Sequence, residues 1–287
     1  WTGCSWAPSI CSREEADGQT HFYLYFANGA SGIGVLTSTS PTGPWTDPLG
    51  KALLTGGSPN CSDVVWMFDP GVMVDDDGTG YLFFGGGVDN RDKANPKTGR
   101  CVKLGDDMIS LAGNPVTMET PYLFEDSSII KIGDTYYYSY CSNWNVPGGT
   151  NINGQTFGSG DICYMTSKNP LGPWTSQQFG GRVFANTGNQ GLDKGGNNHH
   201  SIVYFKNKYY VLYHTRVVEN RMGINLNYRS PSISECTLSN GKLSCSGSHK
   251  GVAQLEALDP YQTVQAETMS SQSKNIQVNG LMDTTVS

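Results

Sequence analysis

The segment TSTSPTGPW at residues 37–45 returns as TSKNPLGPW at residues 166–174, with six identical positions out of nine. A sequence that repeats itself over such a distance indicates a fold assembled from similar structural units. The fold class is inferred from this repeat together with a second element that recurs along the chain.

A second element recurs four times: a short apolar strand, a polar turn and an aromatic-rich strand. The turns Asp77-Gly78, Gly133-Asp134 and Lys206-Asn207 have hairpin chemistry, so each copy is expected to open with two antiparallel strands. Further strands are expected at residues 33–38, 160–166 and 223–229. The four copies pair residues 7–10 with 21–27, 69–74 with 81–85, 125–130 with 135–140, and 199–205 with 209–214.

About four strands in each of about four units predict an all-β fold, the β-propeller. In a propeller the first strand of each blade lines the central channel, so the residues that open the four copies are expected to converge on the axis. These residues are Trp6, Asp69, Glu125 and His199. Two carboxyl groups, an imidazole and an aromatic ring in one funnel make a candidate active site.

Composition narrows the class of protein. The 287 residues include 36 Gly and 15 Tyr, which suits many short strands joined by tight turns. The formal net charge of −6 does not provide the basic surface that binds nucleic acid. No stretch approaches the ~20 apolar residues of a membrane-spanning helix. Neither nucleic acid nor a membrane is therefore expected as a partner.

Cysteine usage points to export. The eight cysteines include no CxxC pair, which favours disulfides in an oxidising compartment over a metal site. Cys236 and Cys245 flank a hairpin turn at residues 239–241, so their thiols are expected to meet across it, while the other pairings stay open. A sequon at Asn60 is compatible with secretion. We expect a secreted, extracellular protein.

Three tracts resemble glycoside hydrolase family 43, whose members are five-bladed β-propellers that act on arabinose- and xylose-containing polysaccharides. The resemblance covers roughly residues 1–257. The tracts are WMFDP at residues 66–70 with VDDDGTGYL at 74–82, FEDSSI at 124–129 with YYYSY at 136–140, and NNHHS at 197–201 with YYVLYH at 209–214.

The resemblance implies a role for each residue that matches a family motif. Glu125 takes the place of the general acid, and Asp69 that of the pKa modulator, the carboxylate that tunes and orients the acid. Close to Asp69 in a partly desolvated funnel, Glu125 is expected to favour its protonated form, which a general acid needs. His199 takes the place of an axial histidine that often lies beside structural Ca²⁺, which it would hold through water. No cofactor is otherwise implied.

The general base is expected to be missing. In the family it is an aspartate of the first blade, which should precede Trp1, whereas the segment WAPS at residues 6–9 matches the second blade. The chain is thus expected to begin one blade late, with the base upstream of Trp1 and absent from residues 1–287. An inverting mechanism needs the base roughly 6.5–9.5 Å from the acid, which leaves room for a water.

Other side chains are candidates for contacts with the sugar. Arg229 resembles a late-blade arginine that faces the acid pair, and surface ion pairing is its alternative. Trp45 and Trp174 lie in the repeated turn and are better explained by packing. Aromatic rings stack on the apolar faces of sugars, and the candidates for pocket walls are Trp6, Trp66, Phe68 and Trp144.

The end of the chain differs from the rest. Residues 258–269, LDPYQTVQAETM, resemble the opening strand of a family 6 carbohydrate-binding module. About thirty residues cannot close the core of a β-sandwich. The predicted domains are therefore a glycosidase propeller at residues 1–257 and the truncated start of a binding module at residues 258–287.

The leading hypothesis is a monomeric glycosidase that removes α-L-arabinofuranosyl side chains from arabinoxylan by an inverting two-carboxylate mechanism. Within the same family, a β-xylosidase and an endo-arabinanase stay open, because pocket shape decides between them. From another class, a non-catalytic carbohydrate-binding propeller is the alternative that the missing base suggests. A sialidase-type propeller is disfavoured because its Ser-x-Asp-x-Gly repeats do not occur.

Overall fold

A computed structural model describes residues 1–88, 90–192, 195–196 and 198–253 of the chain. The chain divides into two compact units, Trp1–His249 and Lys250–Ser287, and the first contains all the strands described below. The predicted start of a binding module at residues 258–287 lies outside the described residues. In the described ranges, no helix is long and apolar enough to cross a membrane.

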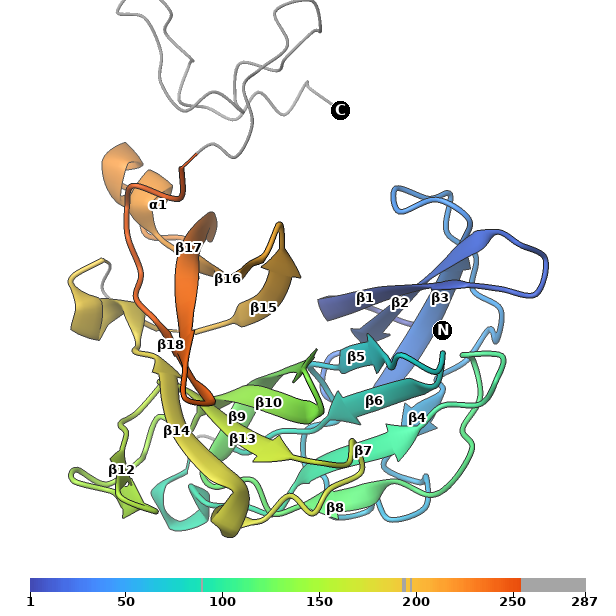
Figure 1. The fold of residues 1–287 in the computed structure, drawn as a ribbon, viewed down its shortest axis with the longest axis horizontal. Helices are drawn as coiled ribbons and strands as arrows, with labels where there is room; N and C mark the ends of the chain where they lie inside the picture. The colour runs from blue at the N-terminus through green and yellow to red at the C-terminus, as the bar shows by residue number, and fades with distance from the viewer. Residues whose placement is uncertain (89, 193–194, 197, 254–287) are drawn as a thin grey trace, which may run out of the picture. The chain divides into compact units, whose positions relative to one another are not determined.

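Four antiparallel sheets of four strands follow one another along the chain (Figure 1). The first contains β1 (Trp6–Glu14), β2 (Thr20–Ala27), β3 (Gly32–Ser38) and β4 (Leu54–Thr55). The second contains β5 (Gly71–Val74), β6 (Gly80–Phe84), β7 (Gly99–Lys103) and β8 (Val116–Met118). The third contains β9 (Leu123–Ile132), β10 (Thr135–Ser142), β13 (Ile162–Ser167) and β14 (Phe179–Phe184). The fourth contains β15 (His200–Phe205), β16 (Lys208–Thr215), β17 (Ser230–Ser239) and β18 (Lys242–Cys245).

Each sheet is a simple meander in which every strand pairs with the next large strand of the chain. Between β10 and β13 the chain forms a small hairpin, β11 (Asn151–Ile152) with β12 (Gln155–Thr156). Three short 3₁₀ helices, η1 (Arg91–Lys93), η2 (Ser176–Gln178) and η3 (Thr187–Gln190), lie in other connections. Four four-stranded meanders in series confirm the predicted all-β propeller with about four blades in this chain.

The hydrophobic core lies between successive sheets. Tyr25 of the first sheet and Leu82 of the second belong to one buried cluster, and Phe83 of the second belongs to another with Tyr138 of the third. A further cluster joins the third and fourth sheets and includes Val211. Sheets that bury both faces in this way stack like the blades of a propeller, so their first strands come together at the inner edge.

The repeated GPW turns share one backbone conformation, and the second copy serves packing, whereas Trp45 of the first copy is half-buried and belongs to none of the core clusters of the described residues. Gly43 and Gly172 have φ values of 88° and 101°, which an L side chain rarely adopts. A Cβ at Gly172 would lie 2.9 Å from the backbone nitrogen of Trp174. Trp174 is 2% exposed and packs edge-on against Phe83, with ring centroids 6.2 Å apart. The prediction that Trp174 is a packing residue is therefore confirmed.

The strand predicted at residues 223–229 was wrong. A short helix, α1 (Val217–Met222), ends at Gly223, and β17 begins only at Ser230. The buried carboxylate of Glu219 accepts the backbone N–H groups of Leu226 and Tyr228 at 3.1 and 2.6 Å. These donors are taken by a side chain, so they are not available to a strand ladder.

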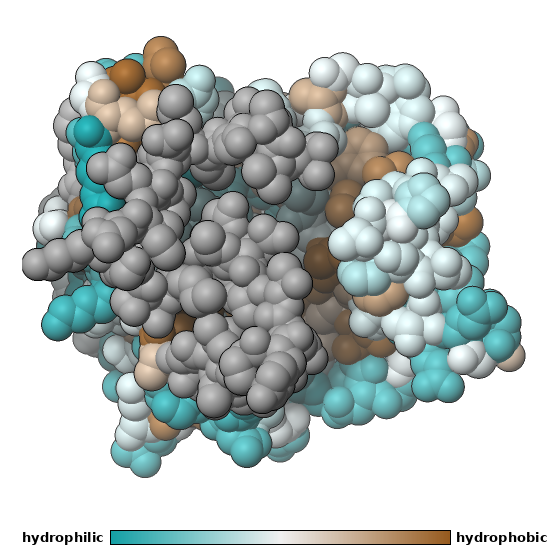
Figure 2. All heavy atoms as spheres, turned by 90° about the horizontal axis from the view of Figure 1, so that it is seen from above, coloured by the Kyte–Doolittle hydropathy of each residue, from teal (hydrophilic) through white to brown (hydrophobic). Residues whose placement is uncertain are grey.

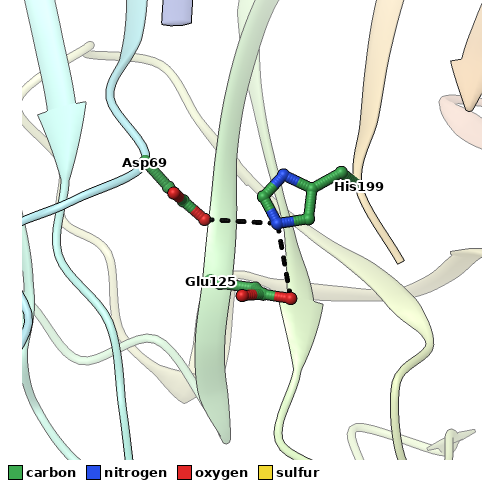
Figure 3. Close-up of side chains that lie close together, drawn as sticks. All are labelled: Asp69, Glu125 and His199. Carbon is green, nitrogen blue, oxygen red and sulfur yellow. Dashed lines mark ion pairs between the residues drawn. The ribbon is translucent and has the colours of Figure 1, made fainter. Parts of the chain in front are cut away.

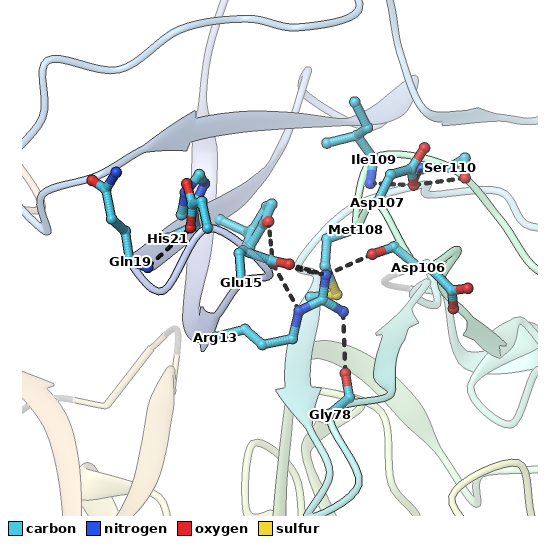
Figure 4. Close-up of polar contacts among 12 residues, drawn as sticks. Arg13, Glu15, Gln19, His21, Gly78, Asp106, Asp107, Met108, Ile109 and Ser110 are labelled. Carbon is cyan, nitrogen blue, oxygen red and sulfur yellow. Dashed lines mark hydrogen bonds and ion pairs between the residues drawn. The ribbon is translucent and has the colours of Figure 1, made fainter.

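One arginine ties the first sheet to the second (Figure 4). Arg13 of β1 donates to the carbonyl oxygens of Gly78 and Asp106 at 3.1 and 2.6 Å, in two loops of the second sheet. Glu15 holds the same guanidinium in place with both carboxylate oxygens, at 2.7 and 2.9 Å. This contact fixes the end of β1 relative to two loops of the second sheet.

A disulfide joins Cys236 and Cys245 across the β17–β18 hairpin. Four of the remaining cysteines are buried as free thiols: Cys61, Cys101, Cys141 and Cys163. The Asn60 amide of the sequon donates to the Pro115 carbonyl oxygen at 2.8 Å. The nitrogen that glycosylation would modify is therefore engaged within the fold.

Candidate active site

Three ionisable side chains from three sheets meet at one point (Figure 3). Asp69 lies just before β5, Glu125 lies in β9, and His199 directly precedes β15. The Nε2 atom of His199 lies 3.5 Å from Oδ2 of Asp69 and 3.4 Å from Oε1 of Glu125. The structure thus brings together three of the four residues that were expected to converge from separate repeats.

The backbone bends sharply beside these side chains. Asp69 and Asp126 have left-handed φ values of 47° and 71°, a region that aspartate enters more readily than most L-residues. The backbone N–H of Asp126 donates to Oδ2 of Asp69 at 2.9 Å. Gly71 permits this approach, because a Cβ there would lie 2.5 Å from the carbonyl oxygen of Ser127. β5 and β9 can therefore lie close enough for both carboxyl groups to reach one imidazole.

Burial and mutual repulsion determine the charges in the site. Asp69 and Glu125 are 3% and 6% exposed. Burial is the main cause that raises the pKa of Asp69 to about 7. The positive charge of His199 lowers this pKa, and the negative charges of Glu125 and Asp126 raise it. Burial alone would lower the pKa of His199, but the three carboxylates outweigh it and raise that pKa to about 9. At neutral pH the ring is a cation among carboxyl groups, and the cluster titrates as a unit.

A cavity of about 570 Å³ extends from this cluster along the inner strands of all four sheets. Asp69, Asp126, His199 and Arg229 lie on its wall, whereas Glu125 is not among the lining residues. Its apolar wall includes the partly exposed side chains of Ile10, Val203 and Leu212. Figure 2 shows apolar atoms inside a hollow on this face of the molecule.

The predicted aromatic walls lie apart from this cavity. Trp66 packs edge-on against Phe68 and Phe124 with centroids 5.1 and 5.4 Å away, and Phe124 packs against Trp144 at 6.2 Å. These rings therefore form a row beside the backbone that leads into Asp69 and Glu125. Phe68 is 6% exposed, so it supports Trp66 instead of offering a face to a sugar. Trp6 is 54% exposed and is not a member of this row.

Sequence reasoning missed the contacts of Asp126 and His200, which directly follow Glu125 and His199 in the chain. Asp126 accepts the backbone N–H of His200 at 2.9 Å and also a hydrogen bond from its Nδ1. His214 is a further contact, because its Nε2 accepts the backbone N–H of His199 at 3.3 Å. Burial, Arg229, His199 and Arg216 lower the pKa of His214 to about 3, so its ring is neutral.

The cluster offers few of the ligands that calcium prefers. Asp69, Glu125 and His199 each offer one ligand atom within 4.8 Å of the others. Calcium prefers about six to eight oxygen ligands, whereas this group supplies two carboxylates and an imidazole that is a cation at neutral pH. The described residues therefore do not fit the calcium predicted at His199.

The family model described as glycosyl hydrolases family 43 matches residues 2–243, which is most of the chain. The chain belongs to this family. The resemblance inferred from the three sequence tracts is thereby confirmed. Hydrolysis of a glycosidic bond uses a pair of carboxyl groups. Among the buried acids of the propeller, Asp69 and Glu125 are therefore the candidates, since both meet at His199.

Two relatives are each 47% identical to this family 43 chain over 279 residues: arabinoxylan arabinofuranohydrolases of Paenibacillus polymyxa and Bacillus subtilis (strain 168). The alignments cover 95% and 94% of this chain but 42% and 52% of the relatives. The chain therefore spans about half the length of these proteins.

Solved structures agree with the propeller fold. A family 43 arabinoxylan arabinofuranohydrolase from Bacillus subtilis, in complex with cellotetraose, is 46% identical with a TM-score of 0.84, covering 94% of this chain and 55% of that one. An α-L-arabinofuranosidase from Clostridium thermocellum is 36% identical with a TM-score of 0.67, covering 88% and 76%.

Proposed function

We propose that this chain carries the general acid and its pKa modulator in a glycosidase that removes α-L-arabinofuranosyl side chains from arabinoxylan with inversion. Two relatives with 47% identity bear the name arabinoxylan arabinofuranohydrolase. The observation that carries the proposal is the buried contact of Asp69 and Glu125 with one imidazole. Such a cluster can store a proton near neutral pH, which protonation of a leaving sugar oxygen requires.

Glu125 is assigned the role of the general acid. Its Oε1 is buried and has no hydrogen-bond partner among the described residues, since the 3.4 Å approach of His199 is an ion-pair distance without hydrogen-bond alignment. Because His199 beside it lines the cavity, Glu125 lies at the inner end of that cavity, where the oxygen of the glycosidic bond has to enter to receive its proton. Asp69 keeps its place as the modulator, because its charge and that of Glu125 repel one another across the imidazole.

The general base is assigned to a segment beyond the described residues. Inversion needs a second carboxylate on the opposite face of the sugar, roughly 6.5–9.5 Å from the acid. Asp69, Glu125 and Asp126 all lie within 3.8 Å of the ring of His199, so they share one side of the site. None of the three can act from the opposite face, which agrees with a base from a further blade.

Arg229 is assigned to a substrate contact inside the cavity, and Trp66 and Trp144 are assigned to sugar contacts outside it. Arg229 lies on the cavity wall, and its charge helps to keep His214 neutral. The partially exposed rings of Trp66 and Trp144 offer apolar faces of the kind that stack on sugars. The substrate proposed for these contacts is arabinoxylan or its oligosaccharides.

The test is release of sugar from arabinoxylan by the chain and by its Glu125→Gln variant, measured by anion-exchange chromatography. Arabinose without xylose supports the proposal, xylose identifies a β-xylosidase, and arabino-oligosaccharides from arabinan identify an endo-arabinanase. The anomer formed first, followed by ¹H NMR, distinguishes inversion from retention. Binding of oligosaccharide with no turnover, also after addition of the upstream segment, would identify the non-catalytic propeller and refute the assignment.

We also infer secretion and a monomeric state. The Cys236–Cys245 disulfide supports an oxidising compartment, where such bonds persist. Mass spectrometry of the protein from its native host under non-reducing conditions, with light scattering for the molar mass, tests both. Recovery from the cytosol with reduced Cys236 and Cys245, or a molar mass twice that of the chain, would contradict these inferences.

A further inference from the structure

A buried hydrogen-bonded chain lies directly behind the proposed acid. Oδ2 of Asp126 accepts both the backbone N–H of His200, at 2.9 Å, and a hydrogen bond from its Nδ1. At the other side of the ring, Nε2 of His200 lies 2.7 Å from Oγ of Ser139. The two ring nitrogens of His200 thus bond to the Asp126 carboxylate on one side and the Ser139 hydroxyl on the other. The chain therefore runs from β10 through β15 to β9.

Asp126 is in contact with every member of the proposed catalytic cluster. It is joined to Glu125 by a peptide bond, its backbone N–H donates to Asp69, and its Oδ1 lies 3.8 Å from Nδ1 of His199. Its own φ of 71° is left-handed, a conformation that an L-residue keeps only where the surroundings hold it. The two hydrogen bonds from His200 to the Asp126 carboxylate stabilise this backbone conformation.

We propose that Asp126, anchored by His200 and Ser139, is a positioning residue that sets the geometry of Glu125, Asp69 and His199. This inference rests on the proposed function of Glu125 as the general acid. The anchor turns the peptide between Glu125 and Asp126 so that its N–H meets Asp69 while the Glu125 side chain reaches His199. Loss of the anchor moves the acid away from the leaving oxygen without removing any group that reacts.

The same three residue types form the catalytic triad of many hydrolases, but this chain serves a different purpose. Ser139 is 2% exposed and the His200 side chain is fully buried. Ser139 is also not among the residues that line the cavity. A hydroxyl in that position does not reach a substrate, so it acts on the site only through His200 and Asp126.

The first test uses Asp126→Gly, because glycine adopts the left-handed backbone without strain, so the change removes the anchor and the carboxylate beside His199 but not the backbone conformation. On arabinoxylan oligosaccharides we expect kcat to fall about a hundredfold at an unchanged KM, as for a displacement of about 1 Å. On 2,4-dinitrophenyl arabinofuranoside we expect little change, because that leaving group departs without a proton. Asp126→Asn, which keeps an acceptor and tolerates the backbone, should recover most of the loss.

The control is Asp134→Asn, at an exposed aspartate of the β9–β10 turn, which should behave as the parent. Equal loss on both substrates, or no loss on either, would overturn the proposal. If neither the unmutated chain nor the chain extended by its upstream segment releases arabinose from either substrate, the proposed function fails instead. The positioning role is then decided by ¹H–¹⁵N NMR of the imidazoles in Ser139→Ala, which weakens the anchor but keeps the Asp126 charge beside His199. A shift in both His200 and His199 would support the role, and His199 resonances that stay unchanged while those of His200 shift would refute it.

Discussion

Replacement of Asp69 by asparagine is expected to stabilise the fold at alkaline pH while it removes activity. The pKa of Asp69 is raised from 3.8 to about 7, chiefly by burial. A carboxyl whose pKa is higher in the folded state favours folding in its protonated form, and the ionised form costs stability as pH rises from about 4 to 7. At roughly 1.4 kcal/mol per pKa unit, the ionised group costs at most about 4 kcal/mol above pH 7.

Part of this gain is offset in the variant. Asparagine keeps the acceptor for the N–H of Asp126 and tolerates the left-handed backbone, but it removes one of the carboxylates that face His199. We therefore expect Asp69→Asn to raise the free energy of unfolding by about 1–3 kcal/mol at pH 8. Below pH 3.8, where the carboxyl is protonated in both the folded and the unfolded state, the gain should vanish, and at pH 4.5 most of it should already be gone.

Urea unfolding at pH 4.5 and pH 8, with arabinose release measured on the same samples, checks this expectation. Asp134→Asn is the matched control, because its carboxylate is exposed and pairs with Lys168 at the surface. That variant should show no gain at pH 8. A destabilised Asp69→Asn at pH 8, or a difference that does not change between the two pH values, would show that the charge of Asp69 does not cost stability.

Three further outcomes are expected. Glu125→Gln should lower kcat on arabinoxylan by about 10²- to 10⁴-fold at similar KM, and parental kcat would exclude Glu125 as the acid. His214→Gln should lessen the loss of stability as pH falls from 6.5 towards 3, because the folded chain keeps His214 neutral down to about pH 3 while the unfolded chain binds a proton there. Urea unfolding at pH 4 and pH 7 measures this, and an unchanged difference in unfolding free energy between the two pH values would contradict it. Calcium should leave the melting temperature unchanged, because the cluster supplies only two carboxylates beside a cationic imidazole where calcium prefers about six to eight oxygen ligands; a rise on titration would support the calcium prediction.

The sequence predicted the architecture and the centre of the site because both follow from a repeating local pattern. Hairpin turns and aromatic-rich strands recur along the chain, and the position of each residue within its repeat identifies the one that opens each blade. Asp69, Glu125 and His199 could therefore be selected before any coordinates. The same reasoning failed at residues 223–229, where Glu219 captures backbone donors and a helix and loop replace the strand.

Aromatic residues show another limit of the pattern. Trp66, Phe68 and Trp144 were all candidate walls, and only the packing of the sheets decides which ring is buried and which presents a face. Phe68 fills the core beside Trp66, while Trp6 is largely exposed. Residue type alone indicates a large apolar surface, and the neighbouring blades determine what covers it.

The sequence by itself thus determined the fold class, the family and which two carboxyl groups meet at His199, since these depend on local periodicity and short motifs. Tertiary structure alone decided the charge state of the cluster and the anchoring of Asp126. The contact between Asp126 and His200 joins residues 74 positions apart on different sheets. The pKa of His199 depends on three carboxylates from two sheets. Both effects arise from distance and burial, and these quantities exist only once the blades have packed.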